Sequence, residues 1–328
     1  MGTLYVDRKG YELQLRDGVV ELRTDGALVR GMPAALVERV VLRADTHLGS
    51  ATLAALADRG IGVLAFGGRA GQRVAHLLGM PHNSARARVA QCQRLDDEEF
   101  ATAWSRAIVR RKLLNQGRLL RAAAVERPEC RKPLTDARDV VERCLDRLPA
   151  AQRRDSVRGL EGGAAASYFR GFATLFAPSL GFERRRRRPP PDPVNACLSL
   201  GYTLLHAQGI EAAWGAGLDP MIGLLHLPVH GRASFACDLV EPWRIAVDGW
   251  VWQQFRDRAL RPEHFGRDGA GACVIGKAAR SHIYAAIEPL MRHCGRGMRR
   301  HARVAARVLA DVARWPEEGD AADSDEVA

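Results

Sequence analysis

The stretch LYVDRKGYELQLRDGVVELR, residues 4–23, decides how the amino-terminal part of the chain folds. Apolar and polar residues alternate along it with a period of two, which is typical of strands that bury one face. Asp17-Gly18 divides this stretch, and Asp25-Gly26 follows it closely. Both pairs favour tight hairpins, because Asp and Gly tolerate the positive φ angles that two-residue turns require. The stretch therefore predicts short strands joined by tight hairpins.

Apolar, β-branched runs at residues 38–45 and 60–68 extend the strand pattern, with a short helical stretch, SATLAALADRG, between them. After residue 82 the pattern changes, because Leu, Ile, Ala and Val recur at helical spacing between arginines and glutamates. This spacing continues to about Trp315. We therefore predict an α+β chain with a β-rich domain at 1–82, a linker at 83–90 and a larger all-α domain at 91–315.

Basic residues outnumber acidic ones in this chain. Its 328 residues include 49 Lys and Arg against 38 Asp and Glu, which gives a formal net charge of +11. Such an excess favours a polyanionic partner such as nucleic acid. The last thirteen residues, 316–328, instead hold six acids and no base. With almost nothing to bury, they predict a disordered tail, or alternatively a tail that shields a basic groove from stray polyanions.

The cysteines and the hydropathy pattern exclude several classes of protein. The seven cysteines are widely spaced and never form a Cys-x-x-Cys pair, which argues against a disulfide framework or a zinc ribbon. The opening residues MGTLYVDRKGYELQL contain no apolar segment of the secretory type, and no stretch approaches the length of a membrane span. We therefore expect a cytoplasmic protein without a membrane partner.

The segment ERRRRRPPPDP, residues 183–193, interrupts the helical pattern. Its prolines deny the backbone a helix. Its five consecutive arginines form either a solvated surface loop or a loop that holds guanidinium groups against phosphates. The net charge of the chain favours the second interpretation.

Glu161 lies beside a predicted helix face in RGLEGGAAASYFRGF, residues 158–172, where apolar residues recur every three to four positions. Gly159, Gly162 and Gly163 surround it. Three glycines in five residues are costly for a purely structural helix, and they would let another chain or a ligand come close. The residues alone leave open whether Glu161 is functional or a surface glutamate near a helix start.

A second cluster, GLDPMIGLLHLPVHGRASFACDLVEPWR at residues 217–244, holds two histidines, three acids and two arginines. His226 ends an apolar run and is a better candidate ligand than His230, which lies in a Gly- and Pro-flanked loop. Asp238 and Glu241 are three residues apart, so on a helix they would project from one face. Pro242 leaves open whether Glu241 ends one element or caps the next.

One imidazole with two or three carboxylates would form a hard, oxygen-rich site that suits Mn²⁺ or Mg²⁺ better than zinc. Such a metal could polarise a phosphodiester and activate an attacking hydroxyl. The residues alone do not bring Glu161 to His226.

The chain resembles the CRISPR-associated integrase family of spacer acquisition, the first of the two universal CRISPR adaptation proteins. The resemblance covers almost the whole chain and rests on several long motifs in the order of the family. They include residues 4–23, NSARARVAQ (83–91), AIVRRKLLNQGRLL (107–120), GLEGGAAASYF (159–169), RRPPPDPVNACLSLGYTLL (187–205), GLDPMIGLLH (217–226) and GRASFACDLVEPWR (231–244).

The resemblance implies an amino-terminal β-sandwich for dimerisation and a helical catalytic domain, in a homodimer that joins a small second CRISPR adaptation protein. It also implies Mn²⁺ or Mg²⁺ held by Glu161, His226 and Glu241, with Asp238 as a supporting catalytic carboxylate. The implied reaction is transesterification, in which the 3′-hydroxyl of a short double-stranded DNA fragment attacks a phosphodiester at the edge of a CRISPR repeat. With water as the nucleophile, the same site would cut DNA.

Phosphate-binding arginines would hold the DNA fragment without reading its sequence. Our candidates are Arg86, Arg88, Arg118, Arg184, Arg185, Arg186, Arg187 and Arg188. Two other functions stay open. One is a metal-dependent DNA repair nuclease without a CRISPR context, and the other is a non-catalytic, basic DNA-binding scaffold whose acids and histidine are structural.

Overall fold

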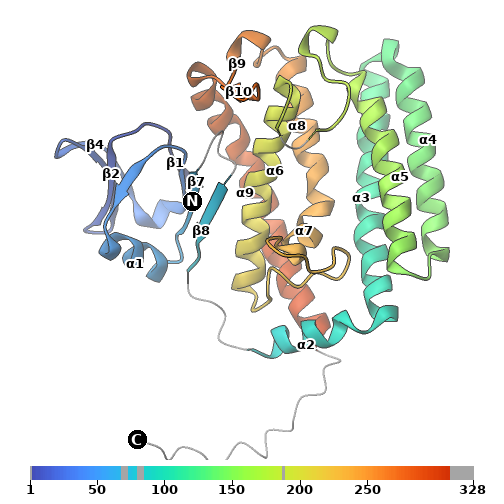
Figure 1. The fold of residues 1–328 in the computed structure, drawn as a ribbon, viewed down its shortest axis with the longest axis horizontal. Helices are drawn as coiled ribbons and strands as arrows, with labels where there is room; N and C mark the ends of the chain where they lie inside the picture. Colours follow the sequence, from blue (N-terminus) through green and yellow to red (C-terminus); the bar gives the residue numbers. More distant parts are fainter. Residues whose placement is uncertain (1, 68–72, 80–84, 187–188, 311–328) are drawn as a thin grey trace, which may run out of the picture.

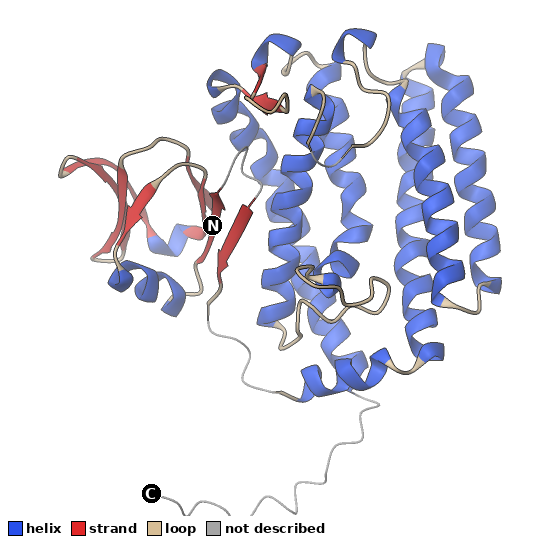
Figure 2. Ribbon diagram, viewed as in Figure 1, coloured by secondary structure: helices blue, strands red, loops and turns tan. Residues whose placement is uncertain are grey.

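The computed structural model describes residues 2–67, 73–79, 85–186 and 189–310 (Figure 1). The predicted acidic tail and two candidate arginines, Arg187 and Arg188, lie outside these ranges. A smaller part made of strands sits beside a larger part made of helices (Figure 2). The predicted α+β class, with an amino-terminal β-sandwich and a larger helical part, is confirmed.

Two four-stranded sheets form the amino-terminal part, in the orders β4-β3-β2-β6 and β1-β5-β7-β8. A short helix, α1 (Ser50–Asp58), follows β6. Asp17 and Gly18, and then Asp25 and Gly26, have positive φ angles, so both predicted hairpin turns are present. The strands are β1 (Gly2–Val6), β2 (Tyr11–Arg16), β3 (Val19–Thr24), β4 (Ala27–Pro33), β5 (Val37–Leu42), β6 (Thr46–Leu48), β7 (Gly62–Gly67) and β8 (Arg73–Leu77).

The sheet that contains β5 is buried on both faces. Val40 and Val63 pack with Leu13 and Val20 of the other sheet, in the core of the sandwich. Val41 and Leu64, one residue further along their strands, belong instead to the core of the helical part. Because successive side chains of a strand point to opposite faces, this double burial explains why the middle of the segment, residues 40–42, is uninterrupted apolar sequence.

Eight helices follow the amino-terminal part in the described residues. The helices α3, α4 and α5 pack side by side, and α6, α8 and α9 form a second group beside them (Figure 1). Their bounds are α2 (Arg86–Leu95), α3 (Glu98–Glu126), α4 (Arg131–Arg147), α5 (Arg154–Ala173), α6 (Pro193–Gly215), α7 (Ser234–Val240), α8 (Arg244–Arg256) and α9 (Lys277–Ala310). No described helix combines the length and the apolar content that a membrane crossing needs.

Side chains specify where the long helices begin. Asp97 accepts a hydrogen bond from the Phe100 backbone N–H at 3.0 Å and so caps α3. Asp192 accepts one from the Asn195 N–H at 2.8 Å and caps α6, whose first residue is Pro193. Proline suits this position, because the first N–H of a helix has no partner within it. The proline run therefore ends at a helix start.

The helical part contains one β-hairpin where the sequence pattern indicated helix throughout. Strands β9 (Phe265–Arg267) and β10 (Cys273–Ile275) pair antiparallel. Between them the Asp268 carboxylate accepts hydrogen bonds from the backbone N–H groups of Ala270 and Ala272, both at 2.9 Å. The expectation of helix was wrong here because this local turn chemistry outweighs the helical spacing on either side.

The helices α6 and α9 hold the sandwich against the helical part. Arg39 of β5 is buried and donates through Nε to Oε1 of Glu211 on α6 at 2.7 Å. Tyr5 stacks on Tyr284 of α9 with their ring centroids 4.3 Å apart. The contacts tie β5 and β1 directly to the two helices.

We expect Glu211→Gln to lower the free energy of unfolding by about 2 kcal/mol. The substitution keeps the shape of the side chain but leaves the Arg39 guanidinium buried without its counter-ion. The loss should stay below that of a fully buried pair, because Glu211 is partly exposed. Urea unfolding would measure it. Glu126→Gln, which removes an exposed partner of Arg256, is the matched control and should cost well under about 1 kcal/mol. Equal losses would contradict a structural role for the Arg39 contact.

Candidate active site

The predicted catalytic residues lie on separate elements of the helical part. Glu161 lies on α5, and Asp238 lies near the end of α7. Glu241 opens the 3₁₀ turn Glu241–Trp243, so it occupies the junction between α7 and α8. His226 lies in the irregular segment before α7 and is partly buried, whereas His230 in the same segment is exposed.

Lys112 of α3 connects Glu161 with Glu241. Its ammonium contacts Oε1 of Glu161 and lies 2.6 Å from Oε2 of Glu241. Burial opposes a charge on Lys112, but the carboxylates of Glu241 and Glu161 outweigh it and hold the pKa of Lys112 above its usual value. Lys112 was not among the predicted residues. A signal was present, since Lys112 and Gln116 place polar groups next to a helix face made of Val109, Leu113 and Leu120.

Asp238 fixes the orientation of His226. Its carboxylate, 1% exposed, accepts hydrogen bonds from the backbone N–H groups of residues 224–226 at 2.7–3.0 Å, and it lies 2.8 Å from Nδ1 of His226. If Nδ1 donates to Asp238, Nε2 is the ring nitrogen left to bind a ligand. Nε2 lies 4.0 Å from Oε1 of Glu241. Gly223 permits this tight loop, because a Cβ there would come within 2.4 Å of the His226 carbonyl oxygen.

Gln91 of α2 holds the other end of the same loop. Its buried amide donates to the carbonyl oxygens of Asp219 and Ile222 at 3.0 and 2.6 Å, and its Oε1 accepts from the Asp219 N–H at 2.9 Å. Three bonds from one side chain fix the backbone just before His226. Gln91 belongs to the quoted motif at 83–91, but that motif gave no hint of which loop it would hold.

Two positive charges neutralise the buried carboxylate of Glu241. Arg244 Nε lies 2.9 Å from Oε1 of Glu241, on the side away from Lys112's contact with Oε2. Burial by itself raises the pKa of Glu241, but the charges of Arg244 and Lys112 outweigh it and lower this pKa to about 2. Glu241 is therefore ionised throughout the neutral range.

A buried tyrosine pair supports the arginines beside the carboxylates. Tyr202 and Tyr168 both donate their hydroxyls to Asp248, the latter at 2.9 Å. Burial raises the pKa of Asp248 to about 6, although these hydrogen bonds oppose the rise. The guanidinium groups of Arg244 and Arg185 lie over the Tyr202 ring, at 4.9 and 5.2 Å from its centroid. Tyr202 thus positions two cations at one site.

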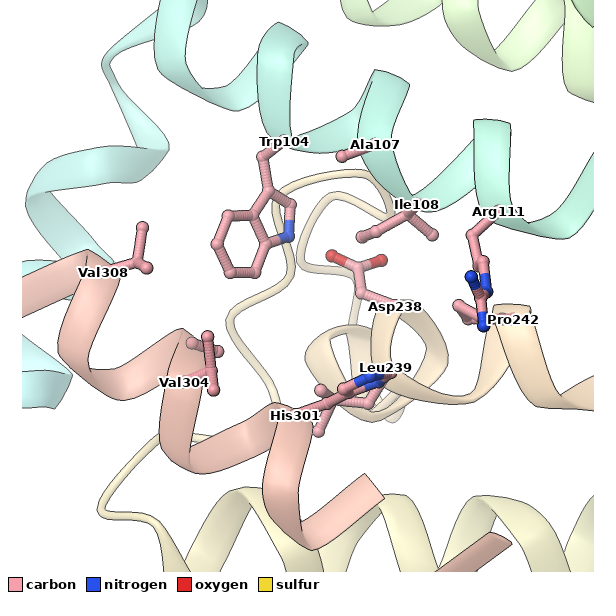
Figure 3. A pocket seen from close by; sticks show the side chains of 11 residues that line it. Trp104, Ala107, Ile108, Arg111, Asp238, Leu239, Pro242, His301, Val304 and Val308 are labelled. Carbon is pink, nitrogen blue, oxygen red and sulfur yellow. The ribbon is translucent and has the colours of Figure 1, made fainter. Parts of the chain in front are cut away.

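Two cavities adjoin these residues. The smaller, of about 90 Å³, is polar and is lined by Lys112, Glu161, Arg185, Tyr202, Glu241 and Arg244, among others. The larger, of about 250 Å³, lies between α3, α7 and α9 and is mostly apolar. Figure 3 shows Trp104 and Ile108 of α3 opposite Val304 and Val308 of α9. In this view the Asp238 carboxylate lies between Trp104 and Pro242. Glu161, Glu241 and the cations beside them therefore line the smaller cavity, whereas Asp238 lines the larger one.

The candidate DNA-binding arginines occupy different positions. Arg185 lines the polar cavity, where it donates to Asn195 Oδ1 at 2.9 Å and to Ser199 Oγ at 3.1 Å. Arg184, Arg186, Arg86 and Arg118 are exposed. Arg88 is partly buried and lies over the Trp214 ring, 5.4 Å from its centroid. Of these arginines only Arg185 shares a cavity with Glu161 and Glu241.

The candidate ligands are of the chemical type that a divalent cation accepts. In the described part of the chain no three His, Cys, Asp or Glu side chains are grouped closely enough to hold a metal ion. Glu161 and Glu241 nevertheless converge on one cation, the Lys112 ammonium, which stands at their meeting point. His226 Nε2 lies on the other side of Glu241. Two carboxylates and one imidazole form a donor set that Mn²⁺ and Mg²⁺ accept.

Comparison with known proteins finds a family model and individual relatives that carry the same name. The family described as "CRISPR associated protein Cas1" matches residues 4–289 of this chain. A CRISPR-associated endonuclease Cas1 from Thermodesulfovibrio yellowstonii is 32% identical over 291 residues, covering 88% of this chain and 91% of that protein. One from Thermus thermophilus is 35% identical over 266 residues, covering 80% of this chain and 78% of that protein.

Solved structures share the fold. A Cas1 protein from Thermotoga maritima superposes with a TM-score of 0.81 at 22% identity, covering 94% of this chain and 97% of that chain. A casposase bound to its integration product also gives 0.81, at 18% identity, and covers 96% of this chain and 92% of that chain. A chain of a Cas6-RT-Cas1–Cas2 complex gives 0.78 at 22% identity, covering 94% of this chain and 35% of that chain.

We expect Asp238→Asn to release the His226 ring and to cost about 2 kcal/mol of folding free energy. An amide N–H₂ in place of one carboxylate oxygen would face either backbone N–H donors or the ring N–H, so at least one bond is lost. Urea unfolding and ¹⁵N NMR of the His226 ring should reveal the loss and a second tautomer. Asp219→Asn is the control, because its Oδ1 accepts the Met221 N–H in an exposed part of the same loop. A single unchanged tautomer in Asp238→Asn would contradict the orienting role.

Proposed function

The chain belongs to the Cas1 family of CRISPR-associated proteins, and we propose that it is a metal-dependent DNA endonuclease and integrase of CRISPR adaptation. It joins the 3′-hydroxyl ends of short double-stranded DNA fragments to the CRISPR repeat by transesterification. The observation that carries this proposal is the convergence of Glu161 and Glu241 from separate elements on one partly buried cation, Lys112, beside an imidazole oriented by Asp238.

Glu161, Glu241 and Nε2 of His226 would hold the divalent cation, Mn²⁺ or Mg²⁺. Such a cation polarises a phosphodiester and activates an attacking hydroxyl. Asp238 keeps Nε2 of His226 turned towards Glu241, and Arg244 keeps the Glu241 carboxylate ionised in its buried position. These contacts orient the metal-binding side chains before the cation binds. Residues behind the metal ligands raise the affinity of a metal site in this way.

The cations of the polar cavity suit a phosphodiester. Lys112, Arg185 and Arg244 line it together with Glu161 and Glu241. Guanidinium groups can donate two parallel hydrogen bonds to phosphate oxygens, and the Tyr202 ring holds both of these in place. Next to Glu161 the helix surface is bare, because a Cβ at Gly159, Gly162 or Gly163 would meet nothing within 4 Å. This bare surface gives a DNA backbone room to approach Glu161.

The candidate arginines would add phosphate contacts to those made by the cavity residues. Arg86, Arg88, Arg118, Arg184, Arg185, Arg186, Arg187 and Arg188 remain our candidates for binding phosphates of the fragment and of the repeat. Phosphate contacts of this kind depend on charge and not on base sequence. The net charge of +11 supports a polyanionic partner such as DNA.

We propose a homodimer that forms through the amino-terminal part. Strand β4 lies at the edge of its sheet, and Leu28 and Val29 on it are 55% and 49% exposed. An edge strand has a neighbouring strand on one side only, and with exposed apolar side chains it offers a surface on which a second chain can pack. A small second adaptation protein would complete the assembly, as the name of the Cas1–Cas2 complex among the similar structures suggests.

We expect Glu161→Ala to lower Mn²⁺-dependent strand transfer by more than about a hundredfold while DNA binding persists. Removing an outer partner of a metal ligand costs 10–100-fold, and removing a ligand itself should cost more. Strand transfer of a short duplex into a plasmid that carries a CRISPR repeat would measure it. Glu142→Ala, on the exposed side of α4, is the matched control.

The same assay separates the rival functions. A repair nuclease would cut DNA but show no preference for the repeat-bearing plasmid over one without the repeat. A non-catalytic scaffold would bind DNA equally well with and without Glu161 and join nothing. Full strand transfer by Glu161→Ala would overturn the assignment of the site.

A further inference from the structure

The position of Lys112 has a chemical consequence beyond its ion pairs. Its side chain is 11% exposed, and its ammonium reaches one oxygen each of Glu161 and Glu241. These carboxylates come from α5 and from the junction of α7 and α8, while Lys112 comes from α3. A cation at this point contacts both carboxylates at once, so a divalent cation that the pair binds here takes the place of the ammonium.

We propose that Lys112 is a positioning residue that holds Glu161 and Glu241 together while the site is empty and competes with the divalent cation for both carboxylates. The proposal rests on the proposed function, because it assumes that these carboxylates are metal ligands. It adds a role for a residue that is not itself a metal ligand.

Electrostatics explains why the chain needs such a residue. Two ionised carboxylates that are screened by little water repel one another, and Glu241 is only 4% exposed. Arg244 neutralises Glu241 through Oε1 but forms no ion pair with Glu161 in the described structure, so it does not hold the two carboxylates together. Lys112 supplies the missing attraction and keeps the ligand oxygens near their working positions.

The same contact must weaken metal binding. A divalent cation gains the attraction of the two carboxylates only after it breaks their contacts with the ammonium. Removing the charge of Lys112 therefore leaves a more negative site, which should bind a divalent cation more tightly. The displaced ammonium stays tethered in the cavity that Arg185 and Arg244 also line, where a phosphate can neutralise it.

The test titrates Mn²⁺ alone into the DNA-free full chain and follows free Mn²⁺ by electron paramagnetic resonance. We expect Lys112→Met, which keeps the apolar stem and removes the charge, to lower the Kd for Mn²⁺ by about tenfold or more. Lys132→Met is the matched control, because Lys132 lies exposed on α4 and pairs only with Asp136. Its Kd should change less than about twofold, since screening by water weakens exposed charges. An unchanged or raised Kd in Lys112→Met would overturn the proposal.

A second measurement uses the unmodified chain and so does not depend on how Lys112→Met folds. We expect the ¹⁵N NMR signal of the Lys112 ammonium, assigned by its absence in Lys112→Arg, to shift when Mg²⁺ saturates the site. A signal that stays in place would overturn the proposal. Glu161→Ala distinguishes this failure from failure of the proposed function. If Glu161→Ala binds Mn²⁺ as tightly as the unmodified chain does, the metal site itself is wrong.

Discussion

The contact of the Lys112 ammonium with Glu161 and Glu241 is the interaction on which the account of the site depends. It brings α3, α5 and the junction of α7 and α8 to one largely buried point, where the opposite charges offset part of the cost of burying one another. Arg244 adds the charge that keeps Glu241 ionised, and Tyr202 with Asp248 holds Arg244 in turn. The chemistry of the site is thus fixed by a chain of ionic and aromatic contacts that reaches across the helical part.

A different set of contacts positions the His226 imidazole at this site. Asp238 and Gln91 both bind backbone groups of the segment before His226, so the ring is positioned by a loop pinned at two points. Gln91 lies on the first helix after the β-sandwich, and the sandwich itself is held by α6 and α9 through Arg39 and Tyr5. The amino-terminal part and the site therefore share a scaffold, although no residue of the sandwich lines the polar cavity.

Local chemistry explains what the sequence could predict. The Asp-Gly turns were predictable because positive φ angles favour these residues wherever they occur, and the double burial of β5 appears directly as an apolar run. His226, Asp238 and Glu241 lie in one segment, so their composition already indicated a site. Contacts between distant segments were not predictable in this way. Lys112 and Glu161 are far apart along the chain, and nothing in either motif specifies that their helices pack together. The β9–β10 hairpin was missed because the turn centred on Asp268 is shorter than the helical pattern around it.

Diffraction from crystals of the chain soaked in Mn²⁺, recorded at a wavelength where manganese scatters anomalously, tests the central claim most directly. We expect one strong anomalous peak within coordination distance of Glu161, Glu241 and Nε2 of His226, with the Lys112 ammonium moved off both carboxylates. A peak elsewhere, or an ammonium that still bridges Glu161 and Glu241 at saturating Mn²⁺, would contradict it.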